Sequence, residues 1–162
     1  MDTRWTGLVV SLALLACKRE HSGTVPGLPD RPSMVPPFNV NVGLTPDATA
    51  ALRRRGETIK VLAVFYGAAN ARGSKYASDM GDISWSDWQE IEIKGPGVAR
   101  FGPRKLNLAL LDYLEDRKPE VLINVVSGRR TSKDNLLDCG IFEDSVFLAG
   151  KKGISINCDL IR

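Results

Sequence analysis

Short stretches of alternating apolar and polar residues recur along the chain, and this is the pattern of β-strands that bury one face. The cleanest examples are residues 38–42 and 154–160, in which every second side chain is apolar. Residues 57–67 carry apolar side chains on both faces, which indicates a central strand covered on two sides over part of its length. Further strands are predicted at residues 88–93, 98–101, 120–127 and 145–149.

Two segments have the spacing of short amphipathic helices, with apolar residues three or four positions apart. The first covers residues 46–55. Thr45 can cap this helix, Pro46 suits its first position, and Gly56 suits the residue that follows its end. The second predicted helix covers residues 106–114.

The predicted strands are mostly separated by turns and not by crossover helices. We therefore expect a mainly β fold, an antiparallel β-sandwich of the Ig-like or transthyretin-like kind, with about seven strands and two short helices. The sandwich is expected to span residues 38–162, with a long polar loop at residues 68–87 and an exposed loop at residues 128–135.

Composition and charge are those of an ordinary globular domain. The chain has 162 residues, of which 43% are hydrophobic and 25% charged, and its formal net charge is +3. No basic stripe interleaved with aromatic residues is present, so we expect no nucleic-acid partner. The three arginines at residues 53–55 fit a solvated helix end, where cations complement the helix dipole, better than an anion site.

The N-terminal segment is apolar but too short to cross a membrane as a helix. Residues 5–16 form its apolar run, whereas about 20 predominantly apolar residues are needed to cross the hydrocarbon. Such a run after a weakly basic start is typical of a secretory signal. Residues 18–37 are rich in proline and predict an extended tether, in which His21 is a solvated residue.

The sequence LLAC at residues 14–17 resembles the lipobox of bacterial lipoprotein precursors. The resemblance implies that residues 1–16 are a signal peptide that is removed, and that Cys17 then carries the lipid. Residues 17–37 would tether the domain to a membrane, which two or more acyl chains can anchor stably. Lys18 after the cysteine implies the outer membrane, on its periplasmic side. The alternative is a buried N-terminal helix, which the prolines that follow disfavour.

Assigning Cys17 to lipid leaves Cys139 and Cys158 in an oxidising compartment, where a remaining pair of cysteines indicates one disulfide. The disulfide would attach the last predicted strand to a turn before it. A metal-binding pair or a redox site is less favoured, because the chain has neither Cys-x-x-Cys spacing nor a nearby histidine.

Patterns for catalysis and metal binding are weak. No histidine lies beyond the tether to act as a base for a serine, and no glycine-rich phosphate loop is present, so we expect no enzyme, no catalytic residue and no cofactor. Asp79, Asp82 and Asp87 lack the spacing of a calcium loop and indicate a solvated acidic loop, not a metal site. Glu90 and Glu92 indicate an exposed strand face and not a catalytic pair.

The aromatic residues of the long loop are candidates for a partner surface. Exposed aromatic side chains beside charges are typical of surfaces that bind proteins, and Tyr76, Trp85 and Trp88 fit this description. The same three side chains could instead close one open end of the sandwich.

Residues 38–67 and 118–146 are similar to a group of small, uncharacterised periplasmic lipoproteins of proteobacteria, a resemblance that implies no particular activity. We expect a lipid-anchored binding or structural module of the bacterial cell envelope, whose partner is an envelope protein or is associated with peptidoglycan. The alternative is an inhibitor or immunity lipoprotein against a cell-wall-degrading toxin. An enzyme of unknown type comes third.

Overall fold

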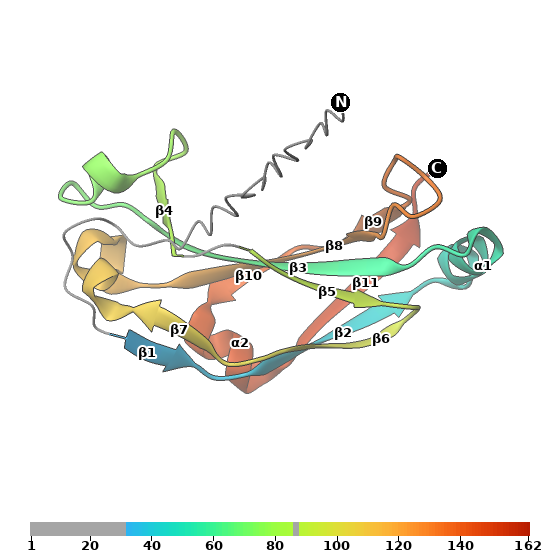
Figure 1. Ribbon diagram of the computed structural model, residues 1–162, viewed down its shortest axis with the longest axis horizontal. Coiled ribbons are helices and arrows are strands. Elements are labelled where there is room, and N and C mark those ends of the chain that lie inside the picture. Colours follow the sequence, from blue (N-terminus) through green and yellow to red (C-terminus); the bar gives the residue numbers. More distant parts are fainter. Residues whose placement is uncertain (1–31, 86–87) are drawn as a thin grey trace, which may run out of the picture.

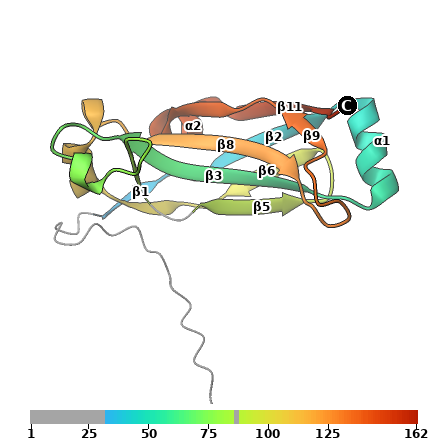
Figure 2. The same ribbon diagram turned by 90° about the horizontal axis from the view of Figure 1, so that it is seen from above.

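Two β-sheets pack face to face in this protein, and one short helix lies at an end of the sandwich (Figure 1). The computed structural model describes residues 32–85 and 88–162. Seen from above, the sheets form two layers and α1 (Pro46–Arg55) stands across one end of them (Figure 2). The predicted mainly β sandwich is confirmed.

The first sheet is antiparallel throughout and is built around one long strand, β3 (Ile59–Ala68). β8 (Glu120–Ser127) pairs with one edge of β3. The other edge pairs first with β5 (Gln89–Ile93) and then with β4 (Asp82–Ser84). β10 (Phe142–Ser145) completes the sheet beside β8. Strict alternation of buried and half-buried residues along β3 and β8 fixes which face packs on the core.

The second sheet has the order β6-β2-β11-β9. Its strands are β6 (Gly97–Phe101), β2 (Phe38–Leu44), β11 (Ile154–Leu160) and β9 (Leu137–Cys139). β2 and β11 run parallel, whereas the other pairs are antiparallel. Turns between neighbouring strands gave no sign of this parallel pair, because almost the whole first sheet separates the two strands in sequence.

The core lies between the sheets and includes three phenylalanines whose rings are in contact. Phe38 stacks on Phe101 with ring centroids 4.9 Å apart and meets Phe65 edge to face at 6.5 Å. The inward positions of the central strands are all buried, as the alternating pattern predicted. These positions are Val40, Val42, Ile59, Val61, Ala63, Val121, Ile123, Val125, Ile154 and Ile156.

The first predicted helix is confirmed as α1, including its caps. The Thr45 hydroxyl accepts a hydrogen bond from the backbone N–H of Ala48 (3.4 Å). Gly56 follows the helix with a φ of 65°, a left-handed conformation that favours glycine.

Residues 145–149 were predicted as a strand, and this prediction is wrong. The segment belongs to α2 (Val146–Lys152), whose start is capped by the Ser145 hydroxyl. Val146 and Ala149 are buried and lie three residues apart, on one face of the helix. A short apolar run does not distinguish the two structures by its periodicity, which explains the error.

The helix predicted at residues 106–114 is also wrong in type. The chain there forms β7 (Arg104–Asn107) and then the 3-10 segments η2 (Leu108–Tyr113) and η3 (Glu115–Arg117). The Asn107 side chain caps η2 by accepting from the backbone N–H of Ala109 (3.0 Å). Leu106, Ala109, Leu110 and Leu114 are nevertheless buried and Leu111 is half-buried, so the pattern identified core residues correctly.

The folded domain begins earlier than predicted. β1 (Pro32–Val35) lies within the range assigned to the tether and pairs with β7 in a separate two-stranded sheet. Val35 is buried, so this end of the range belongs to the domain. Proline is tolerated at the first residue of a strand, which is why a proline-rich stretch can still form one. The polar loop at residues 68–87 likewise contains β4 and the 3-10 turn η1 (Ser74–Tyr76).

The predicted disulfide is confirmed. Cys139 and Cys158 lie directly opposite each other in the β9–β11 pair, with their Cα atoms 4.1 Å apart and their sulfurs joined. The disulfide therefore fixes the last strand of the chain to the edge strand of its sheet.

Candidate binding pocket beside helix α1

A pocket opens at the end of the sandwich that carries α1. Its volume is about 690 Å³, and it lies where α1, the start of β3, the β5–β6 turn and the loop after β8 come together. We call it the α1 pocket. Its lining residues are Leu44, Thr49, Leu52, Arg53, Gly56, Glu57, Thr58, Glu92, Ile93, Lys94, Gly95, Pro96 and Arg130.

Glu57 is a buried carboxylate at the inner side of this pocket, with 3% of its surface exposed. Its oxygens accept hydrogen bonds from the backbone N–H groups of Thr58, Arg130 and Thr131, each at 3.0 Å, and from the Thr131 hydroxyl at 3.1 Å. Burial alone would raise the pKa of Glu57, but these donors outweigh burial and lower its pKa from 4.5 to about 2. The carboxylate is therefore ionised, and it holds the loop after β8 onto the start of β3.

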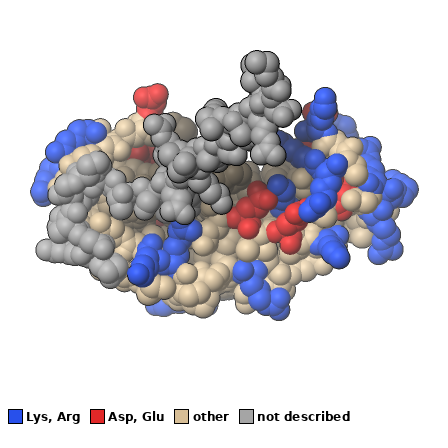
Figure 3. Space-filling model, in the orientation of Figure 1, with Lys and Arg blue, Asp and Glu red and all other residues tan. Residues whose placement is uncertain are grey.

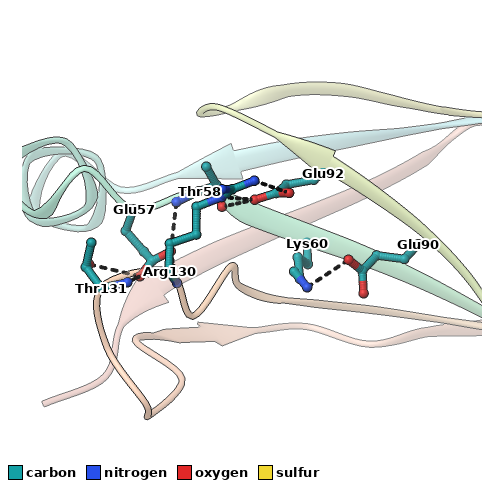
Figure 4. Close-up of polar contacts among 7 residues, drawn as sticks. All are labelled: Glu57, Thr58, Lys60, Glu90, Glu92, Arg130 and Thr131. Carbon is teal, nitrogen blue, oxygen red and sulfur yellow. Dashed lines mark hydrogen bonds and ion pairs between the residues drawn. The ribbon is translucent and has the colours of Figure 1, made fainter. Parts of the chain in front are cut away.

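Arg130 uses the loop position fixed by Glu57 to bind Glu92 on β5. Its guanidinium forms two parallel hydrogen bonds to that carboxylate, at 2.6 Å and 2.7 Å, and Thr58 donates its hydroxyl to the same group (Figure 4). Arg130 and Thr58 lower the pKa of Glu92 to about 2. We call these five residues, Glu57, Thr58, Glu92, Arg130 and Thr131, the Glu57–Arg130 network.

A close backbone approach at Gly128 allows this network to form. The Gly128 N–H donates to the carbonyl oxygen of Thr58 (2.8 Å). A Cβ atom at this position would lie 1.9 Å from the Thr58 hydroxyl oxygen and 3.1 Å from a carboxylate oxygen of Glu57. Any larger residue would therefore push the loop away from the start of β3.

Two cations of the α1 pocket have no acidic partner among the residues that the structure describes. Within residues 32–85 and 88–162, neither Arg53 nor Lys94 forms an ion pair or a side-chain hydrogen bond. Lys60, on the same sheet face as Glu92, is paired with Glu90 at 2.8 Å (Figure 4). Lysine and arginine side chains gather at the α1 end of the molecule, with carboxylates beside them (Figure 3). The pocket therefore combines carboxylates whose oxygens already accept hydrogen bonds with two cations that have no acidic partner among the described residues.

The aromatic residues predicted as a partner surface do not lie on one surface. Trp85 is 4% exposed and packs in the core, Tyr76 is half-buried against Tyr113, and Trp88 is 60% exposed. Trp85 is therefore a core side chain and cannot belong to an exposed partner surface. Only Trp88 is open to a partner among the three.

The other predicted residues divide between the described part of the chain and the rest. Cys17, His21 and Asp87 lie outside the described residues. Glu90 and Glu92 are on an exposed strand face, as predicted, and both are paired with cations. Across residues 32–85 and 88–162, no group of three or more histidine, cysteine or acidic side chains is placed to hold a metal ion. In the same residues no helix has the length and apolar character needed to cross a membrane.

Sequence patterns do not reveal the α1 pocket, although two charged features of the sequence contribute residues to it. These are the arginines of residues 53–55, of which Arg53 lines the pocket, and the pair Glu90 and Glu92, of which Glu92 does. Glu57 and Arg130 are not among these features, because 73 residues separate them in the chain and no local pattern joins them. The one available signal is that Glu57, an acidic residue, lies next to the start of a strongly apolar strand, where a buried charged residue is unusual.

The fold and the pocket define a class of protein: a small disulfide-linked β-sandwich with a charged pocket at one end. No family model, curated protein or solved structure matches the chain.

Proposed function

We propose that the chain is a lipid-anchored binding protein of the bacterial cell envelope and that the α1 pocket is its binding site. The lipobox-like sequence ending at Cys17 supports the anchor, and Lys18 supports the outer membrane, facing the periplasm. The Cys139–Cys158 disulfide is compatible with an oxidising compartment such as the periplasm.

One observation carries the binding role: the α1 pocket is held open by contacts that do not involve a ligand. The Glu57–Arg130 network ties the start of β3, β5 and the loop after β8 together. A pocket that is already ordered loses little conformational entropy when it binds, so binding energy is not used to build the site. Its volume of about 690 Å³ lies within the usual range for small-molecule sites.

The anchor is tested by labelling cells with radioactive palmitate and comparing the wild type with Cys17→Ser. We expect label on the wild type only, and we expect the wild type to fractionate with the outer membrane. Equal labelling of Cys17→Ser would contradict the anchor. The binding role does not depend on this result, because it rests on the pocket.

The binding role is tested by placing a photo-crosslinking amino acid at the pocket mouth, in place of exposed Pro96. Met80 is the matched control, since it is 90% exposed and precedes β4, which pairs with the opposite end of β3. Irradiation of intact envelopes should give a discrete crosslinked product from position 96 and none from position 80. Identical products from both positions, or no product from position 96, would contradict binding at the α1 pocket.

A further inference from the structure

We propose that the ligand of the α1 pocket is a phosphate ester with a short apolar body. This inference rests on the proposed function, because it names the ligand class of the same site. It is carried by three features of the pocket: which of its charges are already used, which elements supply the free cations, and where its apolar side chains lie.

The charges of the pocket leave a positive surplus that is not neutralised from within. Its lining holds three cations, Arg53, Lys94 and Arg130, and two carboxylates, Glu57 and Glu92. Arg130 is bound in a bidentate manner to Glu92, and Glu57 is surrounded by four donors. Arg53 and Lys94 are thus the charges within the described residues that remain for a ligand, and both attract an anion.

Arg53 is also not needed to satisfy the end of its own helix. The last turn of α1 closes with the N–H of Gly56 donating to the carbonyl oxygen of Arg53 (3.2 Å). The N–H of Glu57 donates to the carbonyl oxygen of Leu52 (2.9 Å). Because backbone donors already occupy these carbonyl groups, the guanidinium of Arg53 has no required role there. Its position on the pocket wall is therefore available for a ligand.

The two free cations approach the pocket from different elements, and this favours phosphate over carboxylate. Arg53 comes from α1, whereas Lys94 comes from the β5–β6 turn. A phosphate ester presents several oxygens in different directions and can accept from both cations at once. The two oxygens of a carboxylate lie in one plane and suit a single guanidinium better.

Apolar side chains line the same pocket and indicate that the ligand has an apolar part in addition to its anionic group. Leu44 and Ile93 are half-buried, Leu52 is buried, and Pro96 is exposed at the mouth. An inorganic ion would leave these surfaces in water, whereas a short alkyl chain would cover them and remove apolar area from water. The ligand is therefore amphiphilic.

The test is isothermal titration calorimetry of the full chain with hexyl phosphate. Inorganic phosphate and hexyltrimethylammonium are the matched probes, which lack the apolar body and the negative charge respectively. Hexyl phosphate should bind, inorganic phosphate should bind at least tenfold more weakly, and the ammonium probe should not bind. Stronger binding of the ammonium probe, or equal affinity for the two phosphates, would overturn the proposal.

Two variants locate the binding. Arg53→Gln and Lys94→Gln should each lower the affinity for hexyl phosphate by about tenfold, since each removes one charge-assisted hydrogen bond. Arg55→Gln is the control, because Arg55 is exposed in the same helical turn and does not line the pocket. All three positions are exposed, so circular dichroism should show unchanged folding. If Arg55→Gln lowered the affinity for hexyl phosphate by the same factor, the effect would come from overall positive charge and not from the α1 pocket, which would contradict the site.

A further arm of the titration separates a membrane source of the phosphate group from a soluble one. Vesicles with phosphatidic acid, compared with pure phosphatidylcholine vesicles, report on a lipid headgroup, while hexyl phosphate reports on a soluble ester. Binding in either arm that depends on Arg53 and Lys94 supports the proposal, and binding in neither overturns it. A crosslink from position 96 together with no phosphate binding would refute the ligand class and leave the binding role standing.

Discussion

Replacing Glu57 by glutamine should make the domain less stable and less sensitive to acid. Glutamine keeps the size of the side chain but removes its charge and places an amide NH₂ among donors. The network lowers the pKa of Glu57 from 4.5 to about 2. A fall of this size corresponds to about 3 kcal/mol of folding free energy at neutral pH.

The direction of the pH dependence follows from the lowered pKa. The contribution of Glu57 to the folding free energy is fully present above its unfolded pKa of 4.5, and it is lost as the pH falls towards its folded pKa of about 2. Between pH 7 and pH 3 the wild type should lose about 2 kcal/mol through this one group. Glu57→Gln should lack that loss, because its side chain does not titrate.

Urea unfolding at pH 7 and pH 3, followed by tryptophan fluorescence, measures both effects. Trp85 is buried in the core and reports on unfolding. Glu115→Gln is the control, because Glu115 is exposed in η3 and takes no part in the network. Its pH response should follow the wild type. If Glu57→Gln and the wild type lost the same free energy between the two pH values, the role given to the Glu57–Arg130 network would be refuted.

The same variant gives a second readout at the loop after β8. The Glu57 carboxylate accepts hydrogen bonds from the backbone N–H groups of Arg130 and Thr131. Removing this carboxylate should therefore release a loop that contains two consecutive arginines, Arg129 and Arg130. Limited trypsin digestion should then cut Glu57→Gln near Arg129 and Arg130 faster than the wild type. Cleavage at an unchanged rate would contradict the proposed attachment of the loop.

Three further perturbations test other parts of the structure. Changing Cys139 and Cys158 together to serine should lower the free energy of unfolding by about 3 kcal/mol, the entropy expected for a loop of this length, as measured by urea unfolding without reductant. Gly128→Ala should lower the free energy of unfolding by about 1–3 kcal/mol, because its Cβ would clash with Thr58. An unchanged stability would contradict the close approach of Gly128 to the start of β3. Trp85→Ala should cost about 3–5 kcal/mol, whereas Trp88→Ala should stay within about 0.5 kcal/mol, and the reverse order in thermal unfolding would contradict their placement.

The parts of the fold that could be predicted are those that depend on local patterns. β8 was predicted with its observed bounds, because its inward residues alternate without interruption. α1 was predicted with both caps, because capping depends on residues next to the helix. α2 was not, since its apolar run is too short to show a period. β1 was hidden among prolines and forms only because β7 pairs with it.

The pocket could not be predicted for a related reason. Its residues come from three separate parts of the chain, residues 44–58, residues 92–96 and Arg130, and their chemistry appears only when the sheets place them together. Glu92 looked like one of two outward carboxylates on a strand, while Arg130 belonged to a polar loop. The disulfide was the exception, since the number of cysteines and the expected compartment were sufficient to pair Cys139 with Cys158.

The most direct test of the central claim, that the α1 pocket binds a phosphate ester, is an NMR titration of the full chain with hexyl phosphate. Backbone amide shifts should concentrate at Gly56, Lys94 and Gly95, which line the pocket, and should saturate with a single affinity. Arg53→Gln should reduce all of these shifts together. Shifts centred on Trp88 instead, or no saturable shift at all, would contradict the account.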